Sequence, residues 1–196
     1  DENHARHAVE AAMAMINGLT QINQLFAESS QPAIKIGIGL STGDMNVGDM
    51  GSVYRKAYTV LGDTVNLGAR VESLTKFYGV AILVTEETMK ECPHISFRLI
   101  DKVQVVGKTA AVQLFEPINF TDKLDEEQLN EVKKSQQGIT LFYNKNWPQA
   151  LSLFKELHST TVFSPNIYAI FIERIKGTDL QTLAKDWNGA FKHTQK

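Results

Sequence analysis

The segment from Tyr58 to Arg70, YTVLGDTVNLGAR, constrains the fold more than any other part of the chain. Its β-rich start passes through Gly62 into a helical pattern, so it predicts a strand, a turn and a helix in direct succession. Asp63 or Thr64 can cap this helix by accepting hydrogen bonds from its first N–H groups. The start of a helix is therefore well defined.

The predicted helix separates apolar from polar residues. Asn66 and Arg70 are four positions apart and form a polar stripe that leans toward the helix N-terminus. That end carries unpaired donors and partial positive charge, and a guanidinium suits phosphate oxygens. The pattern indicates an anion-binding helix start, with a solvated face or a local hydrogen bond as the alternative. The expected buried stripe consists of Leu67, Val71, Leu74 and Tyr78.

Composition and charge narrow the function classes. The 196 residues, 43% of them hydrophobic, suffice for one globular domain with a small appendage. A net charge of −2 gives no excess of basic residues and so does not indicate a nucleic-acid-binding protein. No run approaches the roughly 18 apolar residues of a membrane span, and the single Cys92 fits a reducing compartment. We expect a soluble, cytoplasmic chain cut from a larger protein that could be membrane-anchored upstream.

Periodicity predicts an α/β arrangement up to about residue 120. Glycines inside the strand at 33–41 indicate close approach of another backbone, and Gly79 is a helix stop. The expected elements are a helix over 3–27, strands at 33–41 and 57–61 joined by a hairpin-like excursion with a long glycine-rich tip over 44–57, the helix after Gly62, a strand at 80–84, a short helix over 85–91, and a hairpin over 96–117.

Beyond about Asp122 the pattern becomes helical. Small and large residues alternate as in one tetratricopeptide-like helix pair, with the second helix starting at Trp147, and further helices are expected at 165–176 and 180–191. One repeat cannot bury its own apolar face, so this tail should pack on the rest of the chain or on a protein partner. We expect two domains, residues 1–120 and 121–196.

The stretch from Ile34 to Glu87 resembles the catalytic domain of class III adenylate and guanylate cyclases. It contains the element G-D-T-V-N-L-G-A-R, which fits that family's G-[DN]-x-V-N-x-x-x-R. The resemblance implies that Asn66 positions the ribose, that Arg70 stabilises the pentacovalent transition state, and that Thr59 reads the base. Many bacterial adenylate cyclases carry threonine at that position, so the resemblance favours adenine as the base that is bound.

The resemblance covers residues 1–117 and implies a class III cyclase-like α/β (α+β) sheet with flanking helices, lacking its N-terminal portion, followed by a small all-α appendage. The family's Lys-Gly-Lys turn is Val106-Gly107-Lys108 here. Lys108 is then a secondary phosphate contact or an exposed turn residue. Arg55 and Lys56 contact a partner or the phosphates, or belong to a solvated loop tip.

The resemblance also implies two divalent metal ions, magnesium or manganese, held by two aspartates that would precede this sequence. Asp44, Asp49 and Asp63 do not occupy those positions and are interpreted as turn and cap residues. No metal ligand is therefore assigned in this chain. The family builds its sites at a homodimer interface, with the metals from one subunit and the Asn/Arg pair from the other.

The implied function is an adenylate cyclase that converts ATP to 3′,5′-cyclic AMP and pyrophosphate in a bacterial signalling protein. This chain would carry the ribose and transition-state half of the site and would not cyclise ATP alone. The alternative is a non-catalytic cyclase-like module for dimerisation or nucleotide sensing, whose helical tail recruits a protein.

Overall fold

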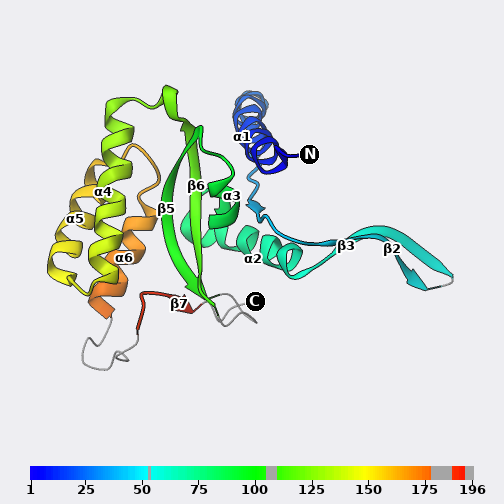
Figure 1. The fold of residues 1–196 in the computed structure, drawn as a ribbon. Coiled ribbons are helices and arrows are strands. Elements are labelled where there is room, and N and C mark those ends of the chain that lie inside the picture. Colours follow the sequence, from blue (N-terminus) through cyan, green and yellow to red (C-terminus); the bar gives the residue numbers. More distant parts are fainter. Residues whose placement is uncertain (53, 105–109, 178–186, 193–196) are drawn as a thin grey trace.

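A mixed five-stranded sheet forms the centre of the computed structural model, which describes residues 1–52, 54–104, 110–177 and 187–192 (Figure 1). The strand order is β1-β4-β6-β5-β7, with β1 parallel to β4, β6 antiparallel to both β4 and β5, and β7 parallel to β5. The predicted α+β class is confirmed. The strands are β1 (Ile38–Leu40), β4 (Ile82–Thr85), β5 (Ile95–Gln104), β6 (Val112–Phe120) and β7 (Phe191–Lys192).

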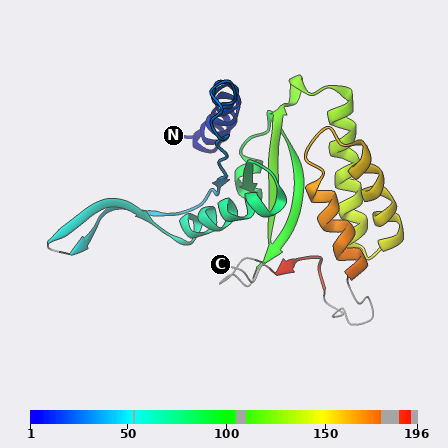
Figure 2. The ribbon, with the colours of Figure 1, turned by 180° about the vertical axis from the view of Figure 1, so that it is seen from behind.

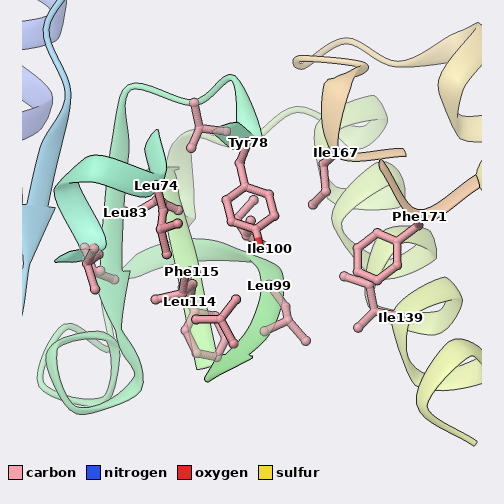
Figure 3. Packing of buried hydrophobic residues seen from close by; sticks show 14 of the residues in the cluster. Leu74, Tyr78, Leu83, Leu99, Ile100, Leu114, Phe115, Ile139, Ile167 and Phe171 are labelled. Atoms are coloured by element: carbon pink, nitrogen blue, oxygen red, sulfur yellow. The ribbon is translucent and has the colours of Figure 1, made fainter. Parts of the chain in front are cut away.

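Helices cover both sides of β5 and β6 (Figures 1 and 2). On one side lie α1 (His4–Glu28), α2 (Asp63–Tyr78) and α3 (Glu86–Lys90); on the other lie α4 (Glu126–Tyr143), α5 (Trp147–Thr160) and α6 (Asn166–Gly177), after a short 3-10 helix, Thr121–Lys123. One apolar cluster runs from α2 through the sheet to α4 and α6 (Figure 3). Within the described ranges, no helix is both long and apolar enough to cross a membrane.

Helix α2 lies directly against β1, as the glycines of the 33–41 segment predict. A Cβ at Gly39 would be 2.2 Å from the backbone nitrogen of Glu72 and 2.5 Å from the carbonyl oxygen of Gly68. Only glycine admits so close a contact between strand and helix. The helix then ends at Gly79, whose φ of 69° is left-handed, as expected for a C-terminal stop.

A second, two-stranded sheet carries the chain into α2. Strands β2 (Asn46–Ser52) and β3 (Arg55–Leu61) are antiparallel, and the ribbon projects away from the rest of the molecule (Figure 1). The predicted hairpin-like excursion is confirmed, but its long glycine-rich tip over 44–57 is wrong, because cross-strand pairing turns most of that segment into strand. Its exposed apolar side chains are Met45, Val47, Tyr54, Tyr58, Val60 and Leu61.

The helical tail packs on the sheet, one of the two arrangements that the sequence left open. Helix α4 begins with a capping box between Asp125 and Gln128, and α5 begins at Trp147 as predicted. Of the expected helix at 180–191, residues 187–190 are not helical and Phe191 belongs to β7. Gly189 has a φ of 86°, which is incompatible with a right-handed helix. The likeness to a tetratricopeptide repeat stays a prediction.

Candidate functional site

The two faces of α2 separate as the sequence predicts. Asn66 is exposed and Arg70 half-buried, one helical turn apart on the N-terminal half of the helix. The opposite stripe is buried against the sheet, so the helix cannot rotate without exposing it. The two polar side chains are thereby held on the outer surface. The buried stripe consists of Leu67, Val71, Leu74 and Tyr78.

The helix start differs from the expectation in its cap. Gly62 occupies the N-cap position, and Asp63 is the first helical residue rather than the cap. A glycine cap provides no side-chain acceptor for the N–H groups of the first turn. Those donors and the positive end of the helix dipole favour an anion at this end, while the Asp63 carboxylate adds a negative charge there.

The other predicted nucleotide contacts come from β3 and from the β5–β6 turn. Thr59 lies opposite Gly48 and is exposed, three residues before Gly62. The structure thus places Thr59, Asn66 and Arg70 on one continuous strand, turn and helix. Arg55 and Lys56 are exposed at the far end of the same strand. Lys108 lies outside the described residues.

The described part of the chain contains no group of three or more His, Cys, Asp or Glu side chains that could hold a metal ion. Asp44 and Asp49 are exposed, the latter within β2, and Asp63 begins α2. The expectation of no metal ligand set in this chain stays a prediction.

Sequence reasoning missed a buried polar cluster at the other end of α2. Its centre is Asp101 of β5, which is fully buried. Asp101 Oδ2 accepts hydrogen bonds of 2.6 Å from the Tyr78 hydroxyl and from Arg174 Nη1 of α6, and Oδ1 lies 3.4 Å from the Tyr143 hydroxyl. The available signal was a charged residue in the middle of an apolar strand, which needs a partner when it is buried.

A second buried cluster joins the sheet to the tail. Arg98 of β5 is fully buried, and its Nε and Nη2 donate to Glu116 Oε2 at 3.0 and 2.6 Å. Its Nη1 lies 3.5 Å from Glu131 Oε1 of α4, which also accepts a 2.7 Å hydrogen bond from the Tyr168 hydroxyl. Residues 98 and 101 of one strand thus both bind the tail by charge.

The tyrosines of these clusters are held in their protonated form. Burial, with the negative charge of Asp101 as a further cause, raises the pKa of Tyr78 and of Tyr143 far above the usual range. Burial raises the pKa of Tyr168 to about 12. At neutral pH all three therefore act as hydrogen-bond donors.

Residues 1–116 match the family model described as the adenylate and guanylate cyclase catalytic domain. The chain belongs to this family. The matched region contains the whole of β2, β3 and α2 and most of the sheet. The predicted resemblance to nucleotidyl cyclases is confirmed at this level.

Three relatives share the likeness in sequence. An adenylate cyclase of Anabaena cylindrica is 38% identical over 59% of this chain, and adenylate cyclase 1 of Rhizobium meliloti is 31% identical over 60%. The terminal-differentiation specific adenylate cyclase of Dictyostelium discoideum is 32% identical over 91%, so that likeness extends into the tail. The chain spans only 25%, 18% and 9% of these three proteins.

Solved cyclase structures have the same fold. The adenylyl cyclase CyaB of P. aeruginosa is 27% identical with a TM-score of 0.55, covering 62% of each chain. The guanylyl cyclase Cya2 is 26% identical with a TM-score of 0.56, covering 64% of this chain and 63% of that one. The neighbours thus include enzymes named for either nucleotide.

Proposed function

We propose that this chain supplies the ribose-binding and transition-state residues of an adenylate cyclase that makes 3′,5′-cyclic AMP for signalling. The ribose 3′-hydroxyl of ATP attacks the α-phosphorus and loses its proton, and the bond to the β-phosphate breaks to release pyrophosphate. Asn66 and Arg70 support the proposal, because they project from one helix within a region that matches the cyclase family.

Each residue has a distinct task in this proposal. Arg70 carries a permanent positive charge that stabilises the extra negative charge of the pentacovalent phosphorus, so it acts mainly in the transition state. Asn66 hydrogen-bonds the ribose and orients the 3′-hydroxyl. Thr59 contacts the base edge, with Lys108 as a secondary phosphate contact. The names of the three relatives favour ATP over GTP.

We propose that the site is divided between two copies of the protein in a homodimer. The catalysis that we infer needs divalent magnesium or manganese, which would supply Lewis acidity to the triphosphate. No group of three or more His, Cys, Asp or Glu side chains among the described residues could hold these ions, so their ligands would come from outside this chain. The β2–β3 hairpin supports dimerisation. An isolated two-stranded hairpin is only marginally stable, and a second subunit packed against it would bury its exposed Tyr58 and Val60.

A second candidate function is a non-catalytic cyclase-like module for dimerisation or nucleotide sensing. It is favoured by the projecting β2–β3 hairpin, whose exposed Tyr58 and Val60 would support dimerisation without catalysis. For either function we propose a cytoplasmic location, a boundary near residue 120, and a protein partner for the tetratricopeptide-like tail at 121–196.

The first experiment measures turnover of ATP by the natural gene product that contains this chain. Arg70→Ala and Asn66→Ala should each lower kcat about 10²–10³-fold, the usual effect of losing one preorganised electrostatic contact. Lys76→Ala, an exposed polar change on the same helix, is the matched control. Wild-type turnover in both site variants would refute the enzyme assignment.

A mixing experiment tests the divided site. The chain alone should be inactive, and it should gain cyclase activity when mixed with a cyclase subunit that keeps its metal aspartates but lacks the Asn/Arg pair. Val60→Asp on the hairpin should weaken both dimerisation and this rescued activity. Robust activity of the chain alone would contradict the division.

A further inference from the structure

The C-terminal end of α2 is held by three residues of the tail, two in α6 and one in β7. Asn166, the first residue of α6, donates from Nδ2 to the carbonyl oxygen of Phe77 at 2.8 Å. The ring of Phe191 in β7 stacks on that of Phe77, with 6.3 Å between centroids. Arg174 of α6 reaches Tyr78 through Asp101. The helix end is therefore fixed by residues distant in sequence.

Arg174 joins Asp101, Tyr78 and Phe191 at this end of the helix. Its Nη1 lies 2.6 Å from Asp101 Oδ2 and its Nη2 3.5 Å from the Tyr78 hydroxyl, while the guanidinium carbon lies 3.9 Å from the centre of the Phe191 ring. The side chain of Arg174 is only 11% exposed and that of Asp101 is 0% exposed. A buried pair held at this geometry resists sliding, because a small shift leaves a charge without its partner.

A helix transmits the position of one end to the other. Residues 66 and 78 are separated by twelve positions of unbroken helix, about 18 Å at the standard rise of 1.5 Å per residue. A tilt at Tyr78 therefore displaces Asn66 and Arg70. Catalytic groups are sensitive to such shifts, since a misplacement of about 1 Å can cost about 10²-fold in rate.

We propose that Arg174 and Asn166 are positioning residues, through which the tail sets the placement of Asn66 and Arg70. This inference rests on the proposed function. The tail is then an integral support of the catalytic helix, rather than a separate appendage. The Dictyostelium relative is consistent with this view, because its likeness covers 91% of the chain and so includes both parts.

The test compares two substitutions in the natural gene product, each of which breaks a buried polar contact of the tail. Arg174→Met removes the charge that reaches Tyr78 through Asp101. Glu131→Gln disturbs the Arg98 cluster, in which Arg98, Glu116, Glu131 and Tyr168 come from β5, β6, α4 and α6 rather than from α2. Arg174→Met should lower kcat between about 10-fold and 100-fold with little change in KM. Glu131→Gln should lower the melting temperature but leave kcat near wild type.

Amide hydrogen exchange of residues 63–70 provides a readout that needs no catalysis. Exchange should accelerate in Arg174→Met and stay unchanged in Glu131→Gln. Asn166→Ala changes an exposed position and should preserve the fold. It should give a smaller loss of kcat and a smaller acceleration of exchange than Arg174→Met. If Arg174→Met does not fold, the Asn166→Ala variant alone tests whether the tail positions α2.

Equal loss of kcat in Arg174→Met and Glu131→Gln would overturn the inference, as would wild-type kcat and exchange in both Arg174→Met and Asn166→Ala. Failure of the proposed function gives a different result, in which Asn66→Ala and Arg70→Ala keep wild-type turnover. Hydrogen exchange of residues 63–70 would then still show whether the tail positions α2.

Discussion

The two ends of α2 lie in opposite environments. At its N-terminal half Asn66 and Arg70 face outward, next to a hairpin whose apolar side chains are exposed. At its C-terminal end Tyr78 is fully buried and hydrogen-bonded to Asp101. The first end is left open, as the proposed binding of a nucleotide and a second subunit would require. The second end is fixed by the chain itself, which keeps the open end in place.

The largest expected effect comes from breaking the buried end. Asp101→Ala leaves Arg174 as a buried charge without its carboxylate and takes the acceptor from Tyr78. Removing one member of a buried pair typically costs about 3–5 kcal/mol, so the free energy of unfolding in urea should fall by that amount. Asp49→Ala, on the exposed hairpin, is the control. Equal stability of the two variants would refute this account of the buried end.

The next effect concerns the contact that seats α2 on the sheet. Gly39→Val should lower the free energy of unfolding by about 1–3 kcal/mol or more, because the added carbons overlap the backbone of Glu72. Gly48→Val is the matched control, since a Cβ at Gly48 meets nothing within 4 Å. Thermal denaturation distinguishes the two, and the same midpoint in both would show that α2 does not pack as described.

Alkaline pH should weaken the buried end through Tyr78. Its pKa is raised in the folded state above the unfolded value of about 10, so its contribution to stability is complete below pH 10 and declines as the pH rises further. Tyr78→Phe should therefore flatten the fall in unfolding free energy above pH 10. Tyr54→Phe, at a residue that is 98% exposed, is the control. An unchanged slope in Tyr78→Phe would contradict the prediction.

The smallest effect on stability belongs to the open end. Asn66→Ala should change the free energy of unfolding by no more than about 0.5 kcal/mol, as is usual for exposed positions. Chemical denaturation measures this directly. A loss as large as that of Asp101→Ala would mean that Asn66 supports the fold rather than a ligand.

Local patterns predicted the elements with strong periodicity or clear stop signals. The faces of α2, its end at Gly79 and the start of α5 at Trp147 all follow from spacing and residue type. The β2–β3 hairpin was expected, but its strands were predicted too short and its tip too long, because glycine-rich strands depend on their pairing partner rather than on propensity. The chain end near Phe191 was mistaken for a helix for the same reason, since β5 pairs with it.

The sequence alone determined the family resemblance and the candidate residues Thr59, Asn66 and Arg70, because these are encoded within one short segment. Only the tertiary structure decided what holds them, since Asp101 and Arg174 are 73 positions apart and their pairing depends on how the tail packs. Candidate site residues can be predicted from sequence when they lie within one contiguous motif. A buried charge pair exists only once the sheet and α6 have excluded water from between them.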